Sequence, residues 1–224
     1  MNYVFQFGIV VDNLPRLLAG AALTVKLAAA ATVLGLAIGI LGAYLRTNGP
    51  RALAWAVAVY IEVFRNTPFL VQLFILYFSL PSLGLRLEAN QAALIGMAIN
   101  FGAYASEILR AGVEAVPEGQ IEAGRALGLG RVQVFRRIIL FQAIRIVYPA
   151  LASQFVLLML GSSVVAAISA EELTAITNTL QSTTFRAFEF YFAATGLYLL
   201  MTLGFRAGLG GLYWYVFERG RRAT

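Results

Sequence analysis

The sequence contains no cysteine and no histidine, and its only lysine is Lys26. A chain without cysteine and histidine cannot form a disulfide, present a thiolate nucleophile or build a zinc site from the usual ligands. It also has no Ser/His/Asp arrangement, no glutamate-rich metal site and no glycine-rich dinucleotide turn. A G-x-x-x-x-G-K-[S/T] phosphate-binding loop is excluded too, because Lys26 follows no such glycine pattern. We therefore predict that the chain is not an enzyme, holds no metal or cofactor, and does not itself bind ATP through such a loop.

Charged residues are scarce as well. They make up 12% of the chain, whereas hydrophobic residues make up 60% and the mean hydropathy is +0.77. These values lie outside the range of soluble domains. The net charge of +6 comes from arginines at the ends of apolar stretches, which is how membrane proteins fix their orientation. We predict an all-α integral membrane protein that is surrounded by membrane lipid and binds no nucleic acid.

Five apolar stretches reach the ~20 residues that a membrane-spanning helix needs. They cover about 17–45, 53–84, 89–113, 134–168 and 188–217. In the first stretch, Gly35 and Gly39 have a small-xxx-small spacing that allows close approach of a second helix. We treat residues 1–224 as a single transmembrane domain.

Arginines indicate the orientation of these spans. They gather after the first and third stretches and in the tail, at Arg46, Arg51, Arg125, Arg131, Arg136, Arg137, Arg219, Arg221 and Arg222. The positive-inside rule then places the N-terminus outside and the C-terminus in the cytoplasm. We expect Met1 to Pro15 to lie along the outer interface. We expect no cleavable signal peptide, because Asp12 is present and no basic start precedes the apolar residues.

The longest polar interruption is residues 117–141, between the third and fourth stretches. Pro117 is suited to open a short helix, and Gly128 is suited to close it in a left-handed cap. We predict a water-exposed segment that a partner could bind. An ordinary amphipathic connector between two spans would have the same polarity.

Two acid–arginine pairs lie inside predicted spans. Glu62 and Arg65 are three residues apart, as are Glu107 and Arg110, so each pair shares a helix face. An unpaired charge in the membrane costs several kcal/mol, and we predict two intramembrane ion pairs. Pairs of this kind could simply hold the helices together. We also expect Thr67-Pro68 to loosen the second helix.

Three sequence blocks resemble one family. Glu122-Ala123-Gly124, followed after three residues by Gly128 and after nine more by Ile138-Ile139-Leu140, resembles the EAA loop of permease subunits of binding-protein-dependent ABC importers. Gly124 replaces the second alanine of that loop, and Phe141 replaces its proline. The segments EVFRNTPFLVQ at 62–72 and GAYASEILR at 102–110 resemble the polar amino-acid branch of the same family.

The resemblance implies a type I importer permease in a bacterial inner membrane, with a cytoplasmic coupling helix within residues 117–130. It implies as partners two copies of a cytoplasmic ATPase that binds ATP and Mg, a second permease, identical or homologous, and an extracytoplasmic amino-acid-binding protein. The residues expected to couple to the ATPase are Gly119, Gln120, Glu122, Ala123, Gly124, Ala126, Leu127 and Gly128.

The residues expected to line the substrate path are Arg65, Phe69, Gln72, Asn100, Tyr104, Gln154, Ser162 and Ser163. The two serines could instead bond back to their own helix. Relatives that carry cationic amino acids have acids where this chain has Phe69 and Ser153-Gln154, so the resemblance favours a neutral polar or acidic amino acid, with glutamine, glutamate and aspartate preferred.

Two other classes of function remain open on the residues alone. An ion-gradient-driven secondary transporter or channel could use Glu62 and Glu107 as a proton relay, although an arginine three residues from each acid would keep it ionised. A purely structural assembly subunit would not need the spacing of the 117–141 segment.

Overall fold

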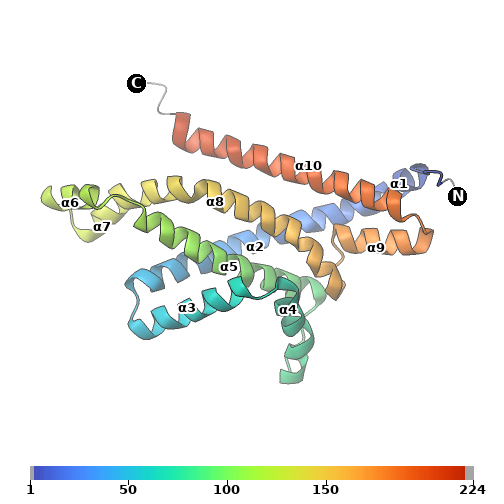
Figure 1. Ribbon diagram of the computed structural model, residues 1–224, viewed down its shortest axis with the longest axis horizontal. Helices are drawn as coiled ribbons and strands as arrows, with labels where there is room; N and C mark the ends of the chain where they lie inside the picture. The colour runs from blue at the N-terminus through green and yellow to red at the C-terminus, as the bar shows by residue number, and fades with distance from the viewer. Residues whose placement is uncertain (1–2, 220–224) are drawn as a thin grey trace.

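The computed structural model describes residues 3–219, which form a bundle of long helices with the shorter ones at its ends and side (Figure 1). The α-helices are α1 (Gly8–Asp12), α2 (Leu14–Asn48), α3 (Arg51–Asn66), α4 (Phe69–Phe74), α5 (Ala89–Glu114), α6 (Glu118–Ala126), α7 (Arg131–Val134), α8 (Leu140–Gly161), α9 (Leu173–Thr184) and α10 (Ala187–Tyr213). Short π-helical turns (Ile75–Ser79, Phe135–Ile139, Trp214–Glu218) and 3-10 turns (Leu80–Leu83, Ser162–Ile168) extend several of them.

Within residues 3–219, four continuous helices are long and apolar enough to cross a membrane, namely Leu14–Asn48, Ala89–Glu114, Val132–Ile168 and Ala187–Glu218. They match four of the five predicted spans. The remaining one is not a single helix, because Arg51–Asn66 and Phe69–Leu83 meet at a bend of 111°. Counted as one broken span, the pair gives the expected five.

The break at Thr67-Pro68 is far sharper than the loosening that the sequence suggested. Pro68 has no backbone N–H and its ring disfavours helical geometry in the preceding residue. Thr67 is accordingly extended, with φ −120° and ψ 148°. The chain therefore leaves the direction of α3, and α4 projects from the side of the bundle (Figure 1).

The most extensive helix contact joins α2 to α5. A Cβ on Gly35 would lie 2.7 Å from the carbonyl oxygen of Ala98, and one on Gly39 would lie 2.6 Å from the Cβ of Ala105. The predicted close approach at these glycines is confirmed. Phe101 is fully buried beside this contact and belongs to the main apolar core.

The N-terminal segment is attached to the beginning of α10. The Tyr3 hydroxyl donates to Glu189 Oε2 at 2.5 Å, and the Gln6 backbone N–H donates to Glu189 Oε1 at 3.0 Å. Arg186 completes the cluster with its Nη1 3.6 Å from Glu189 Oε1. Of the Met1–Pro15 stretch, Met1 and Asn2 lie outside the described residues, and its position at a membrane interface stays a prediction. Arg221 and Arg222 of the basic tail also lie outside them.

Candidate functional site

The polar segment forms its own helix at one end of the bundle, opposite α1 and α9 (Figure 1). Helix α6 ends at a glycine with φ +77°, Gly128, as predicted for a left-handed cap. The Leu129 N–H donates to the Gly124 carbonyl oxygen at 3.1 Å, and the Gly128 N–H donates to that of Arg125 at 2.9 Å. This pair of bonds is the Schellman arrangement that ends a helix. The chain then reverses into α7 and α8.

Gly124, which stands where the family motif has alanine, is the buried residue of α6. Its Cα faces the Ile138 side chain at the start of the next long helix, and an added Cβ would collide with the Ile138 Cδ1 atom. The glycine thus lets α6 lie directly on that helix. Phe141, which replaces the motif proline, lies in a helix that continues without a break, and its ring packs 5.3 Å from that of Phe217.

The other coupling candidates face outward. Gly119, Gln120, Glu122, Ala123, Ala126, Leu127 and Gly128 are all exposed. Leu127 is the extreme case, with 81% of its surface exposed on a polar segment. Only Gln120 among their side chains is hydrogen-bonded in the described structure, accepting from Gln142 Nε2 at 2.6 Å. The segment therefore presents a polar surface with one projecting apolar side chain.

A pocket of about 260 Å³ lies where α4, α5 and α8 meet. It is lined by Phe69, Asn100, Tyr104, Gln154, Leu157, Leu158 and Gly161. Four of the eight predicted path residues, Phe69, Asn100, Tyr104 and Gln154, thus come together from three different helices. None of these lining residues is charged, so the pocket offers two amides, a hydroxyl and apolar surface to a ligand.

Gln72 and Arg65 lie beside this pocket. The Gln72 side-chain amide donates to the carbonyl oxygens of Phe64 at 2.9 Å and Thr67 at 3.0 Å, which the break leaves without helical partners. Its Oε1 accepts from Asn100 Nδ2 at 3.0 Å. Gln72 therefore stabilises the break and orients a pocket residue. The Arg65 guanidinium lies over the Tyr104 ring, 5.5 Å from its centroid.

The two serines do not line the pocket. The Ser162 hydroxyl donates to the Met159 carbonyl oxygen at 2.7 Å, and the Ser163 hydroxyl donates to that of Leu160 at 2.9 Å. Their donors are thus used by the preceding turn, the alternative that the sequence left open. The neighbouring Gly161 lines the pocket instead.

Residues 31–208 match a family described as "Binding-protein-dependent transport system inner membrane component". The chain belongs to this family. It is a multi-pass inner membrane permease of an importer that works with a binding protein and an ATPase. Its type I importer fold is the one predicted from the sequence.

Individual relatives agree with this assignment. An octopine transport system permease protein of Rhizobium meliloti is 40% identical over 194 residues, which cover 83% of this chain and 79% of the relative. A glutamine transport system permease protein of Escherichia coli is 35% identical over 201 residues, covering 89% and 92%. A crystal structure of an amino acid ABC transporter with histidines superposes with a TM-score of 0.89 at 34% identity, covering 96% of this chain and all of that one. The MetNI methionine transporter, at 19% identity, shares the fold with a TM-score of 0.78.

The ion pairs of the permease differ from the prediction at one site. Arg110 pairs with Glu107 as expected, and also with Glu114, which the sequence analysis missed. Glu62 and Arg65 form no ion pair in the described structure. The Glu62 carboxylate accepts instead from Asn66 Nδ2 at 2.8 Å. The reason is the break, because α3 ends at Asn66 and the side chain of that residue hydrogen-bonds the Glu62 carboxylate in place of Arg65.

The pocket residues that sequence reasoning missed are Leu157, Leu158 and Gly161. Leucines in a membrane span carry no chemical signal of a site. The one usable clue was the spacing of Gly161, which lies seven residues after Gln154 and therefore on the same helix face. The permease thus builds its pocket from predicted residues on three helices and from further residues of α8 that the sequence did not single out.

Proposed function

We propose that the permease forms the translocation path for a neutral polar or acidic amino acid, and that the pocket around Gln154 receives it. The observation that carries this proposal is the chemistry of the pocket, which has Gln154, Asn100 and Tyr104 as its polar groups and no carboxylate. A cationic side chain would lose its hydration there without gaining a counter-charge, which is prohibitive. The side-chain amides of Gln154 and Asn100 can both donate hydrogen bonds to and accept them from the side-chain amide of a glutamine or asparagine substrate. The relatives named as glutamine and octopine permeases support an amino-acid substrate.

The same proposal includes the rest of the assembly. ATP and Mg bind to two copies of a separate cytoplasmic ATPase, which contacts the exposed residues of α6. A second permease, identical or homologous, closes the open side of the path. An extracytoplasmic binding protein delivers the amino acid at the end of the bundle that holds α1, which corresponds to an N-terminus outside and a C-terminus in the cytoplasm. The arginine distribution and the position of α6 opposite α1 support this orientation.

The test is uptake by the complete complex in proteoliposomes. The permease, its cognate ATPase and its binding protein are reconstituted, and a panel of radiolabelled amino acids is supplied with ATP inside. We expect ATP-dependent uptake of L-glutamine or an acidic amino acid, and none when a pH gradient replaces ATP. Uptake driven by the pH gradient alone would support a secondary transporter instead. Preferred uptake of arginine, lysine or histidine would contradict the charge argument.

A matched pair of variants tests the pocket itself. Gln154→Glu adds a carboxylate to the pocket and is expected to shift uptake toward cationic amino acids. Gln181→Glu makes the same change on α9, away from the pocket, and should leave selectivity unchanged. If both variants keep the parent selectivity, Gln154 does not help to select the substrate.

A further inference from the structure

A second cavity lies between α8 and α10 and contains an unusual charge. Arg206 is the only charged residue between Glu189 and Glu218, in an otherwise apolar helix. It lies twelve residues before Glu218, or ~18 Å from that end of the helix at ~1.5 Å per residue. Among residues 3–219 it takes part in no ion pair. A cation at this depth is costly unless an anion accompanies it.

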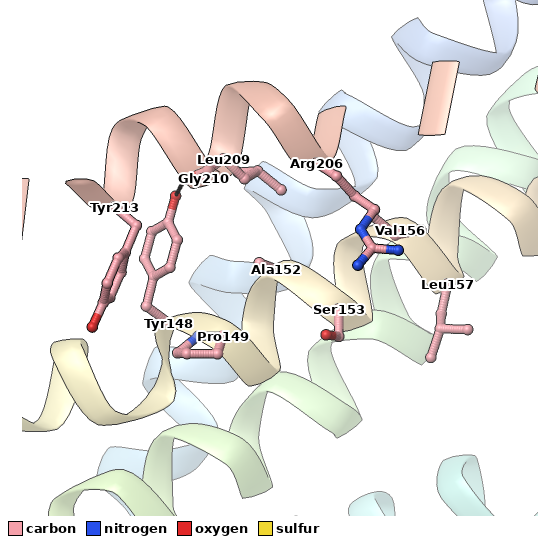
Figure 2. A pocket seen from close by; sticks show the side chains of 10 residues that line it. All are labelled: Tyr148, Pro149, Ala152, Ser153, Val156, Leu157, Arg206, Leu209, Gly210 and Tyr213. Atoms are coloured by element: carbon pink, nitrogen blue, oxygen red, sulfur yellow. Dashed lines mark hydrogen bonds between the residues drawn. The ribbon is translucent and has the colours of Figure 1, made fainter. Parts of the chain in front are cut away.

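The cavity has a volume of about 540 Å³, within the ~300–1,000 Å³ of typical ligand pockets. Arg206 is its only charged lining residue, and Tyr148, Ser153 and Tyr213 are its other polar side chains. Figure 2 shows the guanidinium directed across the cavity toward α8, above Ser153 and away from Tyr213. The Tyr148 hydroxyl donates to the Leu209 carbonyl oxygen at 2.8 Å and joins α8 to α10 beside the cavity.

Two observations indicate what the anion is. The guanidinium is directed toward α8 and away from Tyr213, so it does not extend along α10 toward Glu218. Leu157 lines both this cavity and the pocket around Gln154, so the two spaces adjoin along α8. A molecule in the Gln154 pocket is therefore separated from the Arg206 cavity by one side chain, that of Leu157. An amino acid always carries a carboxylate, and a guanidinium binds a carboxylate through two parallel hydrogen bonds.

We propose that the cavity between α8 and α10 is a second station on the transport path, where Arg206 binds the carboxylate of the amino acid. This inference rests on the proposed amino-acid function. The Gln154 pocket distinguishes one substrate side chain from another, whereas the Arg206 cavity binds the carboxylate that all amino acids share. Arg206 therefore controls passage of the substrate more than its selection.

The chain has no cysteine, which permits a direct test in the permease–ATPase complex. Ser153→Cys places a single permease thiol in the cavity opposite Arg206. The rate at which this thiol is modified is measured with two methanethiosulfonate reagents, the anionic sulfonatoethyl and the cationic trimethylammonioethyl compound. Each rate is divided by the rate at which the same reagent modifies free cysteine. We expect a normalised preference of about tenfold or more for the anionic reagent, because Arg206 is the charged side chain of the cavity lining and attracts an anion while it repels a cation. Adding Arg206→Gln should abolish the preference, whereas Arg206→Lys should retain most of it.

Protection identifies the occupant. We expect L-glutamine or L-glutamate to slow modification of the introduced thiol, and L-glutamine amide, which lacks the carboxylate, not to do so. Arg219→Gln removes one positive charge at the end of α10 and should change neither the preference nor the protection. Uptake by the parent complex should fall about ten- to a hundred-fold on Arg206→Gln, the effect of losing one charged hydrogen bond, with a smaller change in KM.

Three outcomes would overturn the proposal. Equal normalised rates for the two reagents would show that the cavity does not prefer anions. Protection by phosphatidylglycerol vesicles, but not by an amino acid, would identify a lipid phosphate as the anion. A thiol that reacts in the isolated permease and not in the permease–ATPase complex would show that the cavity is closed in the assembled importer and is not open to its substrate. Labelling needs neither ATP nor the binding protein, so failure of ATP-driven uptake would count against the proposed function separately.

Discussion

Replacing Gly128 with alanine tests how the end of α6 controls coupling. Gly128 has φ +77°, and no atom lies within 4 Å of the position that a Cβ would take. Backbone strain is therefore the whole cost, about 1–2 kcal/mol for a residue with a Cβ in left-handed conformation. This lowers the equilibrium constant for the native turn by roughly 5–30-fold. We expect the Leu129 amide, which donates to the Gly124 carbonyl oxygen, to exchange its hydrogen faster by about that factor.

Gly119 provides the matched control. It lies in the first turn of the same helix, also has nothing within 4 Å of its Cβ position, and has no positive φ. Gly119→Ala should therefore stabilise α6 by about 0.5–1 kcal/mol. Hydrogen exchange of the isolated permease is measured first, and ATP-driven uptake second. Our reasoning about the turn is refuted if Gly128→Ala exchanges Leu129 no faster than Gly119→Ala does.

Three further predictions concern stability in detergent. Gly35→Ala should destabilise the permease by about 1–3 kcal/mol, because the added Cβ meets a backbone carbonyl. Gly196→Ala, whose added Cβ would have no atom within 4 Å, should not destabilise it. Equal melting temperatures for the two variants would contradict this prediction. Burial raises the pKa of the Glu172 carboxyl, so its contribution to stability is present at low pH and is lost as pH rises through the folded-state pKa. The stability of the parent relative to Glu172→Gln should therefore fall from pH 4 to 8. A stability difference that does not change with pH would argue against this reasoning. Arg110→Ala should lower the free energy of unfolding more than Glu107→Ala does. The arginine change leaves Glu107 and Glu114 unpaired, whereas the Glu107 change leaves the Arg110–Glu114 pair intact. The reverse order of melting temperatures would count against the paired geometry.

The parts of the fold that depend on local signals were predictable. Apolar length marked four continuous spans, and the positions of Pro117 and Gly128 marked the ends of the short polar helix. Helix spacing also placed Glu107 and Arg110 together. In each case the residues that determine the structure lie within one or two turns of each other, so no knowledge of distant contacts was needed.

The parts that depend on distant contacts were not predictable. The size of the bend at Thr67-Pro68 depends on Gln72 satisfying the freed carbonyls and on Asn100 contacting Gln72 from another helix. The Glu62–Arg65 prediction failed for the same reason, because spacing along a helix does not show whether that helix continues and buries both charges. Leu157 lines two cavities only because α8 passes between α5 and α10.

The contact between α2 and α5 has a mechanical consequence. With Gly35 and Gly39 against the α5 backbone, neither helix can rotate or slide past the other without a steric clash, so the two should move as a rigid body. Helix α5 ends at Glu114, only a short turn before α6 begins at Glu118. If a partner displaces α6, α5 should therefore move with it, together with the side of the pocket that α5 forms. The hydrogen bond from Asn100 of α5 to Gln72 of α4 then ties the projecting α4 to this body, so α4 should follow the same displacement.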